Sequence, residues 1–286
     1  MIRDIAAVTT KHQRINRRGA LNALTASVIG VLSFLVLSSG AIAQTISLGA
    51  AQDFTIVSAA GVTNVGSTVI TGNIALSPNI SITGFGLGEG VVTGTVHSND
   101  DLAIQARTDA FAAYTTLATL TKTIDESGVA LGGLTLTPGI YYFATSADLT
   151  GILTLDTQGD PNALFVFQIG STLTTAVGSS VVVTGAGSGT DTNIYWQVGT
   201  SATIGSETDF EGNILALDSV SLGTGADVLY GRTMALNGAV TLLSNNISMV
   251  PEPETWAMLF FGMGVLGLWN WQRVRRHAFS LGVSKH

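Results

Sequence analysis

Residues 165–174 read FVFQIGSTLT, and residues 194–203 read IYWQVGTSAT. Each segment joins an apolar run to a glutamine and one more apolar residue, then a glycine, then a series of small hydroxyl residues. Two further segments, 214–221 and 233–241, follow the same plan. The chain therefore contains an internal repeat, and a repeat architecture is the first hypothesis that such self-similarity raises.

The period of this repeat is 19 residues, from Gly199 to Asp218 and from Asp218 to Asn237. The longer step from Gly170 to Gly199 is explained by an insertion at 185–191. A unit of this length is too short for a helix pair or a propeller blade. It matches one coil of a three-sided β-helix, with three short strands and their turns. The predicted fold is therefore mainly β.

The first side of each predicted coil is apolar at nearly every position, as at 141–143, 165–167 and 194–196. A strand that buries one face alternates between apolar and polar residues. A continuous apolar run therefore indicates that both faces are covered. Another segment of the chain must lie outside this side.

Residues 101–124 are the predicted cover, because they contain no Gly or Pro and carry a helical apolar stripe. The stripe consists of residues 103, 106, 110, 113, 117, 120 and 124. Ser98 or Asn99 is expected to cap this helix, with Asp100 and Asp101 placed favourably near its positive end. Most of the stripe is alanine, which allows a close approach to the sheet.

The second side alternates, with Leu173, Ala202, Val220 and Leu222 predicted to point inward. This places a series of hydroxyl side chains outward, extended by Thr241 and Thr63. The outward residues are Thr172, Thr174, Ser201, Thr203, Ser219 and Ser221. The third side is more mixed, with Thr71, Val182, Glu211, Asp227 and Leu229 outward.

A flat, rigid array of threonine and serine can hold water in a regular arrangement. Stacked strands repeat every ~4.7–4.9 Å along the axis, and hydroxyl groups anchor water while methyl groups restrict it. The simpler interpretation is that threonine favours strands and stacks well with itself. The near absence of charge beside these residues favours the first interpretation.

Composition excludes several classes of function. Residues 44–249 hold three basic and 16 acidic residues, a formal charge of −13, which disfavours nucleic acids and anionic lipids as partners. The chain has no cysteine, and His97 is the only histidine in this region, so no metal site, cofactor or catalytic residue is predicted. A polysaccharide-degrading enzyme would need a clustered acid pair with Arg232 in a groove.

Both ends of the chain resemble targeting segments. Residues 1–43 combine basic residues, an apolar run and the small-x-small site Ala41-Ile42-Ala43, which predicts a signal peptide cleaved before Gln44. An uncleaved membrane anchor is the alternative. Residues 250–286 combine Pro251-Glu252-Pro253, an apolar stretch of 16 residues and an arginine cluster. This order resembles the PEP-CTERM sorting signal, which implies processing by an exosortase in a Gram-negative bacterium and only transient contact with the membrane.

The region between these ends resembles the microbial ice-binding protein family. The matching segments include 49–57 (GAAQDFTIV), 136–141 (LTPGIY), 153–156 (LTLD), 159–173 (GDPNALFVFQIGSTL), 196–203 (WQVGTSAT) and 238–242 (GAVTL). The resemblance implies a right-handed, discontinuous β-helix with a long α-helix alongside, and antifreeze activity through one flat face. The motif Thr200-Ser201-Ala202-Thr203 is nearest to the Thr-Ala/Gly-x-Thr/Asn pattern of that face, with Ser201 as a departure. Asp148 and Asp218 are charged departures in other coils.

The sequence therefore predicts an exported, non-enzymatic ice-binding protein whose partner is ice or ordered water. The candidate residues are Thr63, Thr172, Thr174, Thr200, Ser201, Thr203, Ser219, Ser221 and Thr241. The alternative is a cell-surface or biofilm-matrix adhesin that binds exopolysaccharide on the same scaffold. In either case the mature protein is expected outside the cell or on its surface.

Overall fold

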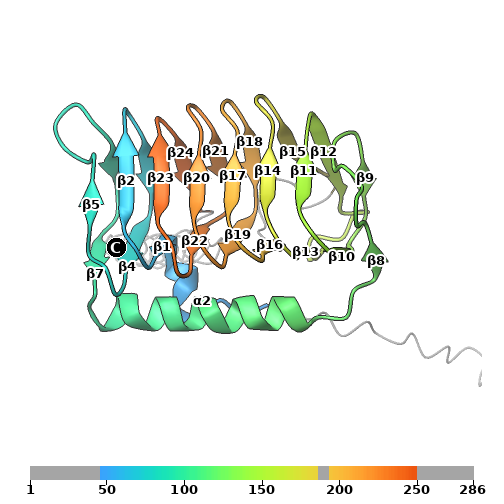
Figure 1. Ribbon diagram of the computed structural model, residues 1–286, viewed down its shortest axis with the longest axis horizontal. Coiled ribbons are helices and arrows are strands. Elements are labelled where there is room, and N and C mark those ends of the chain that lie inside the picture. Colours follow the sequence, from blue (N-terminus) through green and yellow to red (C-terminus); the bar gives the residue numbers. More distant parts are fainter. Residues whose placement is uncertain (1–45, 186–192, 250–286) are drawn as a thin grey trace, which may run out of the picture. The chain divides into compact units, whose positions relative to one another are not determined.

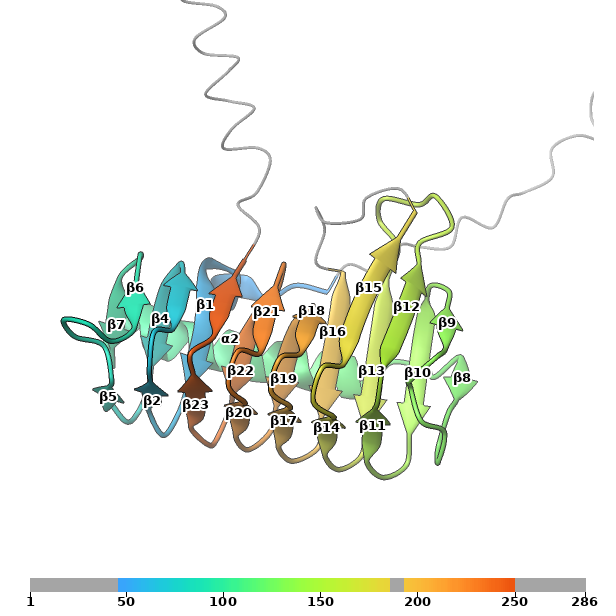
Figure 2. The same ribbon diagram turned by 90° about the horizontal axis from the view of Figure 1, so that it is seen from above.

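The computed structural model describes residues 46–185 and 193–249. These residues wind into a β-helix of three sheets in which all strand pairings are parallel (Figures 1 and 2). The short strands follow the β-branched and aromatic segments of the repeat, and turns rich in Gly, Ser and Asn separate them. The three-sided β-helix predicted from the repeat is confirmed.

Sheet A corresponds to the predicted first side and has nine strands. In order along the axis they are β7 (Val96–Ser98), β4 (Asn73–Leu76), β1 (Phe54–Ser58), β22 (Thr233–Ala235), β19 (Asn213–Ala216), β16 (Ile194–Val198), β13 (Phe165–Ile169), β10 (Gly139–Phe143) and β8 (Ile124–Asp125).

Sheet B corresponds to the second side and has seven strands. They are β11 (Ala147–Leu149), β14 (Leu173–Thr175), β17 (Ala202–Ile204), β20 (Val220–Leu222), β23 (Val240–Leu243), β2 (Val62–Val65) and β5 (Ile82–Thr83). Sheet C has eight strands, namely β6 (Val91–Val92), β3 (Val69–Thr71), β24 (Asn246–Ser248), β21 (Asp227–Leu229), β18 (Asp209–Glu211), β15 (Ser180–Thr184), β12 (Ile152–Asp156) and β9 (Thr135–Leu136).

The coils do not stack in chain order. The first coil, β1 to β3, lies between the last coil, β22 to β24, and the second coil, β4 to β6. The chain then returns along the body as helix α2 (Asp101–Thr119) and begins again at β8 (Figure 1). This insertion is what makes the β-helix discontinuous, and it brings β2 beside β23 in sheet B.

Helix α2 covers the outer face of sheet A, as predicted. Its buried stripe is Ala103, Ala106, Ala110, Ala113 and Leu117. The stripe packs with outward residues of sheet A that include Val166, Tyr195, Leu215 and Met234. Both faces of sheet A are therefore buried, which explains why its strands are apolar at nearly every position. Within residues 46–185 and 193–249, no helix has the length and hydropathy needed to span a membrane.

Both predicted ends of α2 need correction. Asp100, rather than Ser98 or Asn99, is the N-cap, and its carboxylate accepts a hydrogen bond from the backbone N–H of Ala103 at 2.9 Å. This bond and a hydrogen bond with His97 lower the pKa of Asp100. At the other end the helix stops at Thr119, and Ile124 belongs to β8 instead of the helical stripe.

The repeated glutamine explains where the helix stops. The side chain of Gln168 donates to the backbone carbonyls of Leu117 and Leu120, at 2.7 and 2.8 Å. The last carbonyls of a helix lack regular partners inside the helix, and this amide binds two carbonyls there, of which that of Leu117 also accepts a long bond from the backbone N–H of Leu120. A residue of β13, far away in the sequence, therefore fixes the end of α2.

The inside of the β-helix contains a stack of aromatic rings from successive coils. The ring of Tyr141 lies 5.4 Å from that of Phe167, and Phe167 lies 3.9 Å from Trp196 with an interplanar angle of 8°. Phe210, in the same coil as Trp196, packs 4.9 Å from it. All four side chains are buried. Each coil thus packs on its neighbours through large apolar surfaces, as in other solenoids.

The repeated glycine lies at the corner between sheets A and B. A Cβ atom at Gly199 would come within 2.4 Å of the carbonyl oxygen of Gly170. A Cβ atom at Gly170 would come within 2.5 Å of the carbonyl oxygen of Ala144. The coils that contain Gly170 and Gly199 therefore approach too closely at this corner for a side chain at either position.

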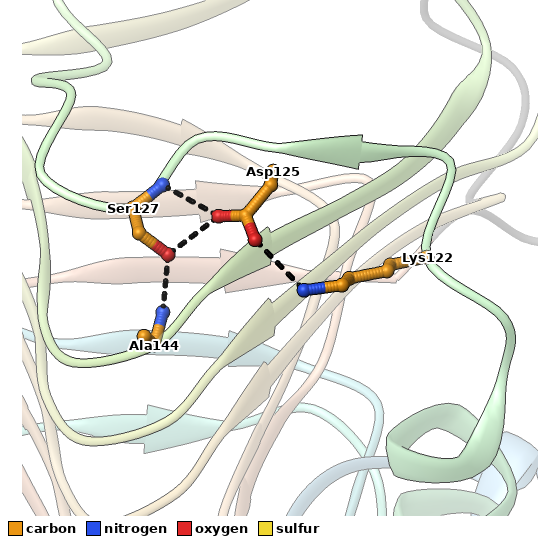
Figure 3. Close-up of polar contacts among 4 residues, drawn as sticks. All are labelled: Lys122, Asp125, Ser127 and Ala144. Carbon is orange, nitrogen blue, oxygen red and sulfur yellow. Dashed lines mark hydrogen bonds and ion pairs between the residues drawn. The ribbon is translucent and has the colours of Figure 1, made fainter.

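A polar cluster closes the β8 end of the body (Figure 3). The side chain of Asp125 accepts hydrogen bonds from Lys122 and from the backbone and hydroxyl of Ser127, and the Ser127 hydroxyl accepts one from the backbone of Ala144. The bonds from Lys122 and Ser127 lower the pKa of Asp125 to about 2. The segment that contains β8 is therefore tied to the residue that follows β10, and we assign this cluster a structural role.

Candidate functional site

One column of outward side chains runs along sheet B. Its members, in order from β14 to β5, are Thr174, Thr203, Ser221, Thr241, Thr63 and Thr83. We call these six residues the central column. Each is aligned with the next across a parallel strand pair, so the hydroxyl groups repeat at the strand spacing of ~4.7–4.9 Å. Figure 1 shows the seven strands of sheet B side by side, with no other segment drawn across them.

The central column is held in place by the residues on either side of each member. In β17, Ala202 and Ile204 are buried and Thr203 is exposed. The same alternation occurs in β14, and in β20 the central residue Ser221 is partly exposed between two buried neighbours. Because the neighbours fill the core, each central residue points outward. Threonine is also restricted at χ1, which limits the positions of its hydroxyl and methyl groups.

The hydroxyl groups of the central column are available to solvent. Among the residues that the structure describes, none of the six forms a hydrogen bond with another protein group. No strand of sheet B carries a basic residue, and only β11, at one end, carries an acidic residue, Asp148. The surface is therefore a row of unpaired alcohols on a rigid support.

A second column lies two residues earlier in each coil and uses its hydroxyl groups differently. The Thr172 hydroxyl donates to the Ser146 hydroxyl at 2.8 Å. The Ser201 hydroxyl accepts from the backbone N–H of Ser219, and the Ser219 hydroxyl accepts from the N–H of Ala239, both at 3.3 Å. These residues are partly buried and contribute to the corner between sheets A and B.

Thr200 does not belong to the exposed surface, contrary to the prediction from its motif. Its hydroxyl oxygen is buried and has no hydrogen-bond partner within the described part of the chain. Thr200 follows Gly199 at the tight corner between β16 and β17. We therefore leave Thr200 out of the candidate surface.

Thr83 is a member of the central column that the sequence analysis missed. It lies in β5, a strand of only two residues, and pairs with Thr63. The available signal was the alternation of Ile82, Thr83 and Gly84. This signal is too short to establish a strand, and the coil that contains it departs from the repeat.

The third side of the body is less suited to such a role, because carboxylates interrupt it. Asp209 pairs with Asp227 on sheet C, and Glu211 pairs with Leu229. Burial raises the pKa of Glu211 to about 7. Burial, together with the nearby Asp209 and Glu207, also raises the pKa of Asp227. Sheet A is covered by α2, so sheet B alone offers an open surface of small alcohols.

Replacing Glu211 with glutamine is expected to stabilise the fold at pH 8 and to have little effect at pH 4. The pKa of Glu211 rises from 4.5 to about 7 on folding, so the folded state disfavours its ionisation. Stability therefore falls as pH rises between these values, and E211Q removes about 1–3 kcal/mol of penalty at pH 8. Urea unfolding at both pH values measures this difference, and an equal gain at both would contradict the assignment.

The other candidate sites considered from sequence have structural explanations. His97 contacts the N-cap Asp100 at 2.8 Å and packs edge-on against Phe54. The side chain of Arg232 is buried, where it donates to the Gln52 carbonyl and to the Asn213 side chain. Over residues 46–185 and 193–249, no group of His, Cys, Asp and Glu side chains is arranged to hold a metal ion.

Comparison with known proteins assigns residues 56–248 to the family model described as ice-binding-like. Residues 250–276 match the PEP-CTERM protein-sorting motif. Both matches agree with the two resemblances inferred from the sequence.

Among curated proteins, the chain is 45% identical to an ice-binding protein of Nostoc sp. (strain HG1) over 267 residues, which cover 89% of this chain and 95% of that protein. It is 33% identical to an ice-binding protein of Flavobacterium frigoris (strain PS1), over 74% of this chain and 79% of that protein. Among solved structures, an ice-binding protein of the Antarctic ascomycete Antarctomyces psychrotrophicus superposes with a TM-score of 0.69 at 38% identity, covering 73% of this chain and 100% of that one.

Proposed function

The chain belongs to the ice-binding-like family, and from this premise we propose that it adsorbs to ice through the central column of sheet B. Adsorbed protein stops the growth of the ice surface that it covers, and the outcome is thermal hysteresis and inhibition of ice recrystallisation. The observation that carries the proposal is the unbroken register of six outward alcohols on an open face.

The physical basis is the match between a rigid protein lattice and ordered water. Each threonine presents a hydroxyl group that can bond one water and a methyl group that restricts the neighbouring waters. A hydrogen bond of this kind contributes about 0.5–1.5 kcal/mol net. Six residues that bind together to one solid surface add to a substantial affinity. Because the β-helix is already ordered, little conformational entropy is lost on adsorption.

Thr172, Ser201 and Ser219 are proposed to support this face from its border. Their hydroxyl groups hold the corner between sheets A and B through the hydrogen bonds described above. Their partly buried position leaves the first layer of bound water to the central column. We propose no catalytic role for any residue, in agreement with a family of binding proteins.

We propose that the protein acts outside the cell. The PEP-CTERM motif at 250–276 supports export and processing by an exosortase-type enzyme, with only transient contact with the membrane. Residues 1–43 and 250–286 lie outside the described residues. We propose that the first segment is a signal peptide cleaved before Gln44 and that the second is the sorting segment. An adhesin that binds exopolysaccharide finds no support in the relatives above.

Partition into ice tests the proposed function directly. The fluorescently labelled full chain is mixed with a labelled globular protein of similar charge, and the solution is frozen slowly on a cold surface. We expect the chain to be enriched in the ice while the control protein stays in the liquid. If both remain in the liquid and no thermal hysteresis is measured, the proposal is wrong, and a polysaccharide pull-down becomes the next experiment.

A further inference from the structure

The structure assigns a specific role to Asp148: we propose that this residue sets the length of the ice-binding array by ending it at β14. The inference rests on the proposed function and deepens it. Asp148 pairs with Thr174 in the same register that joins all six residues of the central column. It therefore occupies the position that a seventh threonine would take.

The local geometry of Asp148 matches that of the central column. Its neighbours Ala147 and Leu149 are buried and Asp148 is exposed, the pattern of Leu173, Thr174 and Thr175 in β14. The carboxylate is thus directed outward, in line with the threonine hydroxyl groups. No basic side chain within the described ranges forms an ion pair with it.

A carboxylate at this position cannot continue the array. It is a strongly hydrated charge that accepts hydrogen bonds and donates none when ionised, and it lacks the methyl group of threonine. Transfer of a charge from liquid water to a less responsive environment is costly. The waters around Asp148 therefore keep the order that the charge imposes, and the ice-like layer ends at the previous strand.

Protection of an exposed sheet edge is the competing explanation for a charged residue in β11, the terminal strand of sheet B. Two observations weigh against it. The edge of β11 is already covered, because the backbone N–H of Leu131 donates to the Asp148 carbonyl. At the opposite edge of the same sheet, β5 carries Thr83 and no charged residue.

Asp218 is the second charged departure noted in the sequence, but it does not interrupt the column. It precedes β20, and its backbone N–H donates to the Thr200 carbonyl at the corner of the coil. Its charge raises the pKa of Tyr114, on helix α2, after the larger effect of burial. The charge of Asp218 therefore lies near helix α2, outside the central column. Asp148 is the residue that limits the array.

The test compares the full chain with D148T and with the control D209T, which removes the same charge from sheet C. D148T should lower the concentration for half-maximal inhibition of recrystallisation about two- to tenfold. This is the change in affinity expected from one added hydrogen bond to ice. D209T should leave it unchanged. D148S, which restores the hydroxyl group without the methyl group, should give a smaller gain, and the melting temperature of each variant reports its folding.

The outcomes separate the two proposals. If the unmodified chain inhibits recrystallisation and D148T does not improve it, the role of Asp148 is wrong and the proposed function stands. An equal gain in D209T would also overturn the role of Asp148, because the effect would then be one of net charge. If neither the unmodified chain nor D148T has any activity, the proposed function itself fails, and the inference with it.

Discussion

Replacing Thr203 with tyrosine is expected to abolish thermal hysteresis without unfolding the protein. Thr203 lies between Thr174 and Ser221 in the central column. A tyrosine ring would project beyond the hydroxyl groups on both sides and hold the sheet away from the ice. Because the six residues bind ice together, losing their simultaneous contact should lower the affinity for ice by about tenfold or more, equivalent to at least about 1.4 kcal/mol of binding free energy. Thermal hysteresis and circular dichroism of the same preparation measure the two effects.

S221Y, one strand further along, should give the same result, because it interrupts the same column. The matched control is V182Y on sheet C, where Val182 is 37% exposed on an outward position. This variant adds the same ring to a different face and should retain full hysteresis. If T203Y and S221Y both remained active, sheet B would not be the binding face.

The largest effect on stability is expected from replacing Trp196 with alanine. The Trp196 side chain is fully buried, stacks on Phe167 at 3.9 Å and donates from Nε1 to the Glu211 carbonyl. Removing a large buried aromatic leaves a cavity and costs about 3–5 kcal/mol. At a typical urea slope of about 2 kcal/mol per molar, the unfolding midpoint should fall by about 2 M.

The control for W196A is L87A, because Leu87 is fully exposed, at 107% of its reference area. This change should alter stability by no more than about 0.5 kcal/mol. Because Trp196 belongs to the aromatic stack, its loss should weaken the contacts of β16 with both neighbouring coils. A midpoint for W196A close to that of L87A would contradict the assigned role of the stack.

Local sequence patterns were sufficient to predict much of the fold. The 19-residue repeat predicted the coil, the continuous apolar runs predicted a covered sheet, and the alanine stripe predicted the helix that covers it. The same alternation placed Thr174, Thr203 and Ser221 outward. Apart from the length of the repeat, these predictions depend on the direction of a side chain relative to its immediate neighbours.

The predictions that were wrong concern positions where residues distant in the sequence determine the local structure. The helix was expected to continue to residue 124, but Gln168 satisfies the carbonyls of Leu117 and Leu120 and ends it at Thr119. Thr200 matched the expected motif, yet its hydroxyl is buried at the corner of a coil. Neither result follows from the local pattern, because the position of each group depends on how the coils and the helix pack together.

The sequence by itself determined which side chains point out of each coil, because strand periodicity is a local property of the backbone. The tertiary structure alone decided the order of the coils, since the first coil is inserted between the last and the second. That insertion pairs Thr63 with Thr241, which joins Thr63 and Thr83 of the first two coils to the rest of the row, and Asp148 lies at its far end. The physical reason is that parallel strands pair through backbone hydrogen bonds, which form in the same way whichever coil comes first in the chain. The length and continuity of the alcohol array therefore arise only when the coils are stacked.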